Sequence, residues 1–133
     1  MRIPIIAALA LATLTFSALA PKTALAAPAP PSLQLPAQAD IQFPPTTFKI
    51  VVVASCQEGT GTVIIRAVQG VLANGLAFGP FPCDGQKHQV EIFLTSMAPW
   101  SAGDVDVQGQ ACEGNGGSGV ICSDPEFKSV HLN

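Results

Sequence analysis

The sequence predicts an all-β protein: a small immunoglobulin-like antiparallel β-sandwich of six to seven strands with two disulfides. Three observations support this fold class. Short segments with alternating apolar and polar residues recur after residue 46, with turn signals about every 8–12 residues. No segment beyond the first 26 residues has the i, i+3, i+4 apolar spacing of a helix. Four cysteines all lie in this same part of the chain.

The first half of the predicted sandwich holds three extended segments. Residues 47–55 are apolar on nearly both faces, which indicates a central strand. Residues 62–69 alternate and predict a second strand. Residues 71–78 contain Asn74-Gly75, and this pair fits both positive-φ positions of a type I′ turn, so we expect a hairpin there.

Turn residues then separate three further strands. The run Gly79–Pro82 interrupts the alternation, and Cys83–Gly85 predicts a turn. Strands are expected over 87–95, 104–111 and 126–132. Because the only tryptophan follows a proline in a loop and tyrosine is absent, the resemblance to immunoglobulin domains is one of architecture only.

The N-terminus has the pattern of an export signal. Arg2 precedes a run without charge, Ile3–Ala20, and Ala24-Leu25-Ala26 forms an A-x-A site. Cleavage after Ala26 is favoured over cleavage after Ala20, because a proline follows Ala20. A membrane anchor is the alternative, and the early proline and the peptidase site speak against it. We therefore predict a signal peptide over 1–26, a tether over 27–45 and the β-sandwich domain over 46–133.

The tether is predicted from its prolines, which favour extended conformations without hydrogen bonds. Within it, Ile41 and Phe43 suggest a short edge strand that Pro44-Pro45 ends. The tether's six prolines are Pro28, Pro30, Pro31, Pro36, Pro44 and Pro45.

An even number of cysteines in a small exported domain predicts two disulfides. Of the three possible pairings we favour Cys56–Cys83 and Cys112–Cys122, because the second pair brackets the glycine-rich loop 114–119. A zinc site is disfavoured because there is no C-x-x-C pair.

The chain expected after export is sparse in charge and acidic. Four Lys and Arg residues stand against nine Asp and Glu residues, a net charge of −5. Nucleic acids and anionic lipids both attract clustered cations, so neither is an expected partner. No cysteine at the cleavage site offers a lipid anchor, and we expect a secreted, monomeric protein without stable membrane insertion.

Several short motifs lie within about residues 47–111: Cys56-Gln57-Glu58-Gly59-Thr60, Val63-Ile64-Ile65, Gln69-Gly70, Cys83-Asp84-Gly85 with His88, and Gly103-Asp104-Val105-Asp106-Val107. Together they resemble a group of small secreted proteins from actinobacteria whose function is uncharacterised. This resemblance implies a bacterial β-sandwich with a Cys56–Cys83 bridge and no established catalytic residues. A second resemblance, to neocarzinostatin-type apoproteins, implies a carrier with an apolar cleft.

Catalytic chemistry has one candidate. Asp84 and His88 are suitably spaced for an acid–base pair, with Ser55 or Ser96 as nucleophile. No G-x-S-x-G elbow is present, and Asp84 is a common turn-capping residue, so we favour the capping interpretation. His131 lies too near the terminus to suggest catalysis.

Metal binding has weak support in the sequence. Oxygen ligands for calcium are available, but there is no D-x-D-x-D-G loop, and alternating acids are typical of a solvent-facing strand. We expect neither a metal nor a cofactor. The residues considered were Asp104, Asp106, Glu113, Asn115, Asp124 and Glu126.

Two loops remain as candidate binding sites. Trp100 is expected to be partly exposed and to contact a partner, or else to cap the core. Asn115 and Ser118 lie at the tip of the disulfide-clamped loop. We expect a secreted non-enzymatic protein that binds a protein, a glycan or a small apolar ligand, or that belongs to the cell envelope. The alternatives are a small-ligand carrier and a small hydrolase or inhibitor.

Overall fold

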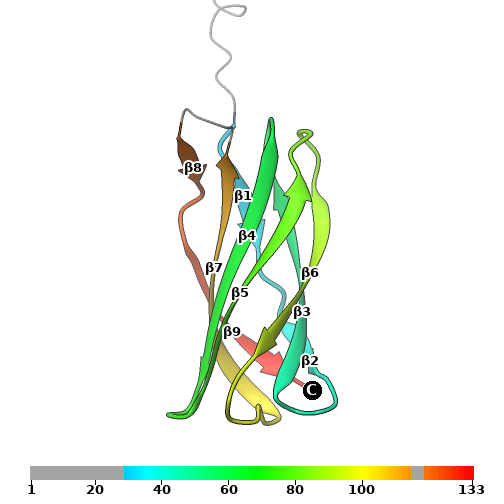
Figure 1. Ribbon diagram of the computed structural model, residues 1–133, viewed down its shortest axis with the longest axis vertical. Helices are drawn as coiled ribbons and strands as arrows, with labels where there is room; N and C mark the ends of the chain where they lie inside the picture. The colour runs from blue at the N-terminus through cyan, green and yellow to red at the C-terminus, as the bar shows by residue number, and fades with distance from the viewer. Residues whose placement is uncertain (1–28, 115–118) are drawn as a thin grey trace, which may run out of the picture.

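The computed structural model describes residues 29–114 and 119–133, in which every regular element is a β-strand (Figure 1). The predicted signal peptide over 1–26 and the candidate residues Asn115 and Ser118 lie outside the described residues. No helix in the described part is long and apolar enough to cross a membrane. The strands are β1 (Ser32–Gln34), β2 (Gln38–Ile41), β3 (Thr47–Ser55), β4 (Thr60–Gln69), β5 (Ala73–Pro82), β6 (His88–Thr95), β7 (Gly103–Gly114), β8 (Val120–Cys122) and β9 (Glu126–Leu132).

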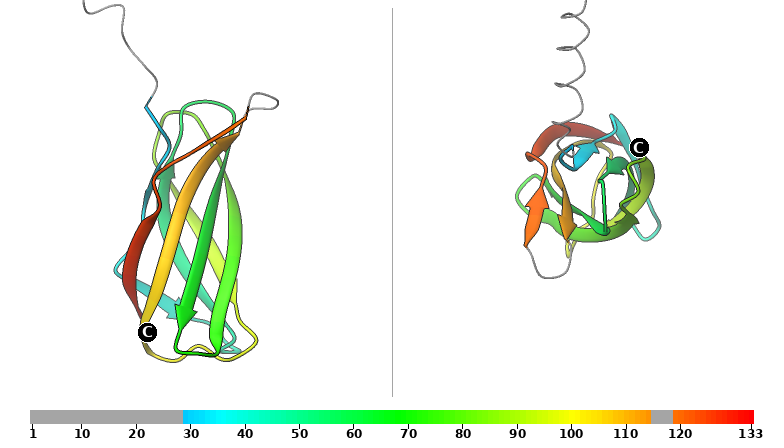
Figure 2. Two further views of the ribbon diagram at one scale, coloured as in Figure 1. Left: turned by 90° about the vertical axis from the view of Figure 1, so that its left-hand side faces the viewer. Right: turned by 90° about the horizontal axis from the view of Figure 1, so that it is seen from above.

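The strands form one curled sheet that folds over itself into two layers. One layer contains β1, β3 and β6, and the other runs β9-β7-β4-β5 with β8 paired to β7. Strand β2 joins the layers, since Gln38 and Ala39 pair with β9 whereas Asp40 and Ile41 pair with β3. Figure 2 shows the β9-β7-β4-β5 layer in its left view and, end-on, the strands arranged around one interior.

The period-two pattern of the sequence determines what fills that interior. In β3, alternate residues from Phe48 to Ala54 are fully buried, and those between them are half-buried. Strand β3 pairs with β1, β2 and β6, which confirms its central position. The largest fully buried side chains are Phe48, Leu35, Ile50, Ile65, Ile92, Leu94, Leu132, Val52, Val63, Val105, Val130 and Cys56.

Both predicted disulfides are present. Cys56 and Cys83 follow strands of different layers and tie the layers together at one end. Cys112 and Cys122 lie directly opposite each other on β7 and β8. The all-β sandwich is thus confirmed, and the described residues contain nine strands rather than six or seven, because β1, β2 and β8 are too short to give a periodic signal.

The predicted hairpin at Asn74-Gly75 is wrong. Both residues lie within β5, where Asn74 pairs with Val68 of β4, and the turn falls three residues earlier. Gly70, at φ 65°, provides the positive-φ position of that turn. Gly75 is needed for a different reason: a Cβ there would lie 2.9 Å from the backbone oxygen of Thr95. Close approach of two chain segments, not a turn, requires this glycine.

Two proline-based predictions are also wrong. The run Gly79–Pro82 continues β5 instead of breaking it, and the prolines are tolerated because β5 is an edge strand. The tether over 27–45 is not extended free chain, since β1 and β2 lie within it. Leu35 and Ala39 are buried in the core, so this segment is part of the domain.

Candidate functional site

Trp100 is a core residue, contrary to the expectation of partial exposure. Its side chain is 2 % exposed and meets the ring of Phe48 edge-on at a centroid distance of 4.8 Å. The indole N–H donates to the carbonyl oxygen of Leu94 at 3.1 Å. Trp100 therefore caps the core at this end of the sandwich and offers no surface to a partner.

Three loops surround the buried tryptophan. They connect β2 to β3 (42–46), β4 to β5 (70–72) and β6 to β7 (96–102), and they lie together at the lower end of the molecule in Figure 1. We call these three loops the loop end. The first described residues precede β1, which pairs with the far end of β3, so the chain enters the domain at the opposite end.

Hydrogen bonds join the three loops to one another. The backbone N–H groups of Ser96 and Trp100 donate to the carbonyl oxygens of Thr46 and Pro45, at 2.8 and 2.9 Å. The nearly buried Ser96 hydroxyl accepts from the N–H of Asn74 at 3.1 Å.

The end of β4, from which the β4–β5 loop starts, is held to the β6–β7 loop by one glutamine. The Gln69 side chain accepts from the Ser101 N–H and donates to the Ser101 carbonyl, each at 2.8 Å. The loop end is therefore a connected structure rather than three independent turns.

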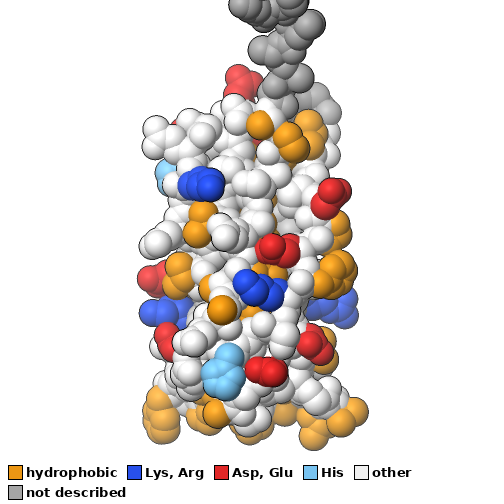
Figure 3. Space-filling view, turned by 180° about the vertical axis from the view of Figure 1, so that it is seen from behind, with side chains coloured by type: hydrophobic (Ala, Val, Ile, Leu, Met, Phe, Trp, Pro, Cys, Tyr) orange, Lys and Arg blue, Asp and Glu red, His pale blue; other side chains and the backbone are white. Residues whose placement is uncertain are grey.

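Apolar side chains project from this structure into solvent. Met97 is 99 % exposed, Phe43 97 %, Val71 93 % and Leu72 76 %. Figure 3 shows hydrophobic side chains gathered along this lower end. Isolated exposed apolar residues are normal, but a group of them at one end of a molecule marks an interaction surface.

The loop end also lacks charge. None of the residues 42–46, 70–72 and 96–102 is Asp, Glu, Lys, Arg or His. The nearest ionisable pair that the structure places behind the loops is Asp104 with His131, whose side chains are 3.4 Å apart. The loop end is thus apolar at its tip, with ionisable side chains behind it.

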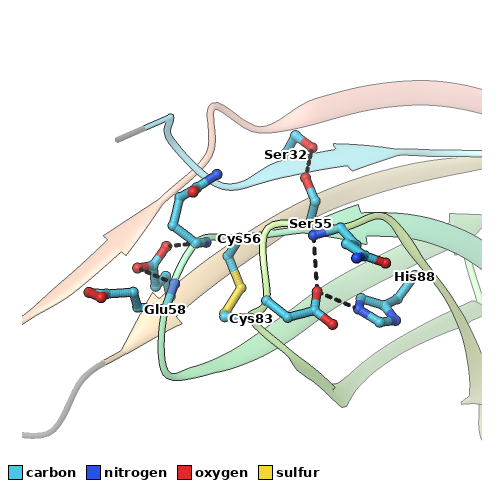
Figure 4. The surroundings of a disulfide bond; sticks show 10 residues. Ser32, Ser55, Cys56, Glu58, Cys83 and His88 are labelled. Carbon is cyan, nitrogen blue, oxygen red and sulfur yellow. Dashed lines mark hydrogen bonds and ion pairs between the residues drawn. A yellow bond between two sulfur atoms is a disulfide. The ribbon is translucent and has the colours of Figure 1, made fainter. Parts of the chain in front are cut away.

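The corner beside the Cys56–Cys83 bridge holds the catalytic candidate (Figure 4). One carboxylate oxygen of Asp84 lies 2.8 Å from Nε2 of His88 and also accepts from the N–H of Gln86 at 2.9 Å. These two hydrogen bonds, the one to His88 above all, lower the pKa of the exposed Asp84 carboxyl. Asp84 therefore caps its own turn and pairs with His88.

Neither candidate nucleophile completes a catalytic site with this pair. Ser96 follows the far end of β6, whereas His88 begins that strand. The Ser55 hydroxyl is hydrogen-bonded to the Ser32 hydroxyl at 2.6 Å. The contacts at this corner fit the turn-capping interpretation.

The acidic residues considered as calcium ligands are dispersed. Glu113 accepts from the N–H groups of Gln57 and Glu58, and Glu126 accepts from the N–H of Leu35 at 2.7 Å. Within the described ranges, the one cluster of three metal-ligating residue types joins Glu113 to Cys56 and Cys83, whose sulfur atoms form a disulfide.

A second surface feature lies on the outer face of the β9-β7-β4 layer. It is an open groove of about 470 Å³, with Phe127 on β9, Gln108 on β7 and Arg66 on β4 in one row across the strands. No ion pair within the described part of the chain involves Arg66. The groove combines an apolar wall with an available guanidinium group.

Comparison of the chain with protein-family models, curated proteins and solved structures finds no match. The loop end therefore has to be interpreted from its own chemistry. Sequence reasoning missed it because Val71 and Leu72 were placed in a hairpin and Phe43 near a strand. The available signal was the combination of apolar residues with turn residues and the absence of charge in three separate segments.

Proposed function

We propose that this protein is a secreted, non-enzymatic binding protein associated with the cell envelope, and that it contacts an apolar partner through the loop end. The observation that carries the proposal is the almost complete exposure of Phe43, Val71 and Met97 on hydrogen-bonded loops. Two disulfides are consistent with an extracellular location.

Energetics support a binding role for these side chains. Moving one such side chain from water into an apolar environment is favourable by roughly 1.5–3 kcal/mol, and a side chain that stays exposed does not contribute this free energy. The interior of the domain already contains a full apolar core, so the exposed residues are not needed to stabilise the fold.

The test is retention on a phenyl chromatography matrix, comparing the protein with the triple variant Phe43→Ser, Val71→Ser, Met97→Ser. The matched control is Phe93→Ser, because Phe93 is half-exposed on β6, outside the loop end. We expect the triple variant to elute at clearly higher salt, and the control to elute with the parent protein. Equal elution of all three proteins would contradict the proposal, as would ester hydrolysis that disappears in His88→Gln.

The groove beside Phe127 favours one alternative function, a small-ligand carrier. A ligand with an apolar body and an acidic group would match its wall and Arg66. A compound that co-purifies with the protein, and is lost in Arg66→Gln but retained in the triple loop variant, would favour this alternative.

A further inference from the structure

We propose that the partner of the loop end is the uncharged surface of a lipid layer, into which Phe43, Val71 and Met97 insert as separate apolar tips. This inference rests on the proposed function and adds to it the chemistry of the partner.

The shape of the loop end favours a fluid partner. Each tip stands on its own loop, and three of the side chains are more than nine-tenths exposed. A protein partner would need three matching recesses, whereas lipid chains rearrange around projecting side chains. A hollow of about 310 Å³ between the β4–β5 and β6–β7 loops, lined by Leu72 and Pro99 among others, leaves room for lipid between the tips.

The charge distribution specifies the kind of lipid. Peripheral proteins that bind anionic lipids use clusters of Lys and Arg. The loop end has no cation, and residues 27–133 carry a net charge of −5. An anionic surface would therefore repel the protein, and a zwitterionic or uncharged surface is the one that fits. On the face that Figure 3 shows, the acidic, basic and histidine side chains lie above the apolar lower end, where they would remain in water.

The hydrogen bonds of the loop end prepare it for insertion. The Ser96 and Trp100 N–H groups hold the β2–β3 loop to the β6–β7 loop, and Gln69 holds the β4–β5 loop to Ser101. Because the loops are ordered when the protein folds, little conformational entropy remains to be lost on insertion. The buried Trp100 supports this arrangement from below as a positioning residue.

The expected affinity is modest. Full burial of one apolar side chain changes affinity by roughly one to two powers of ten. Three tips that insert partly should together resemble a single myristoyl chain, with an association constant on the order of 10⁴ M⁻¹. We therefore expect reversible attachment at millimolar lipid, not permanent anchoring.

The first experiment is cosedimentation of the exported protein with vesicles of pure phosphatidylcholine. We expect the protein to sediment at millimolar lipid and the triple variant Phe43→Ser, Val71→Ser, Met97→Ser to lose about 100-fold or more in affinity. Phe93→Ser should bind like the parent protein. Circular dichroism of the triple variant should be unchanged, because all three side chains lie outside the core.

Vesicle composition and self-association separate the possible partners. Adding phosphatidylglycerol should weaken binding at low salt. Binding that strengthens instead, or an unaffected triple variant, would overturn the lipid proposal. If the triple variant loses retention on the phenyl matrix but the parent protein does not bind vesicles, the proposed function stands and the lipid partner is wrong. Dimerisation that the triple variant abolishes, without vesicle binding, would assign the surface to a second copy.

A second experiment reports insertion directly. The chain has one tryptophan and no tyrosine, and Trp100 is already buried, so its emission should hardly respond to lipid. In the variant Phe43→Trp, a new indole is placed at a tip. Its emission should shift to shorter wavelength with phosphatidylcholine vesicles and be quenched by brominated acyl chains. If the emission does not shift under conditions in which the protein cosediments with the vesicles, this tip does not enter the lipid.

Discussion

Trp100 lies in the core, whereas the tips Phe43, Val71 and Met97 are exposed, so substitution of Trp100 should lower stability and substitution of a tip should not. Trp100→Phe retains an aromatic ring against Phe48 but removes the N–H that donates to the Leu94 carbonyl at 3.1 Å. Losing this hydrogen bond, together with the volume by which an indole exceeds a phenyl ring, should cost about 1–3 kcal/mol. The net stability of small domains is about 5–15 kcal/mol, so a loss near 2 kcal/mol is a large fraction of it. For a domain of this size, such a loss should lower Tm by about 10 °C. Trp100→Ala should lose about 3–5 kcal/mol.

The assay is urea unfolding followed by far-ultraviolet circular dichroism, since the variant contains no fluorescent tryptophan. Phe43→Ser is the contrasting variant, and its stability should lie within about 0.5 kcal/mol of the parent protein because the side chain is almost wholly exposed. The reasoning would be refuted if Trp100→Phe left the unfolding midpoint unchanged and yet abolished vesicle binding. That result would identify Trp100 as a contact residue, the other of the two roles that its loop position suggests.

Three further predictions concern the rest of the fold. His88→Gln should raise the pKa of the Asp84 carboxyl, because it removes the imidazole that contributes most to lowering that pKa, and the carboxyl resonances in an NMR titration would report the change. Because the folded-state pKa is lowered, the stabilisation is present above the ordinary carboxyl pKa and disappears as pH falls through the folded pKa. A disulfide that closes a longer loop removes more conformational entropy from the unfolded chain. Replacing both cysteines of the Cys56–Cys83 bridge, with a sequence separation of 27, should therefore cost about 3.5 kcal/mol in urea unfolding, and replacing Cys112 and Cys122, with a separation of 10, about 2.7 kcal/mol. The reverse order would contradict this argument. Gly75→Ala should lose about 1–3 kcal/mol because the new Cβ approaches the Thr95 carbonyl, and a neutral effect on urea unfolding would contradict this close approach.

Local patterns were sufficient for much of the fold. The strands over 47–55 and 126–132 have the predicted bounds, because successive side chains point to opposite faces in any strand and this alternation can be recognised locally. The cysteine pairing was also predicted, because Cys112 and Cys122 bracket the glycine-rich loop 114–119 and leave Cys56 to pair with Cys83.

Turn and proline signals were less informative. Asn74-Gly75 and the prolines of β5 have strong local preferences that the structure overrides, because pairing with β4 and the edge position of β5 decide their conformation. The prolines of residues 28–45 likewise concealed two short strands, whose buried residues Leu35 and Ala39 are recognised only from contacts across the sandwich.

The candidate site depended on tertiary structure almost entirely. The sequence by itself determined that this is a disulfide-linked β-sandwich, and it located Met97 and Trp100 in one loop. Only the folded structure decided that Trp100 turns inward onto Phe48 while Met97 turns outward, and that Met97 shares its end of the molecule with Phe43. The physical reason is that burial is set by contacts between residues far apart in the chain. A local pattern shows which residues are apolar but not which of them the core has room to enclose.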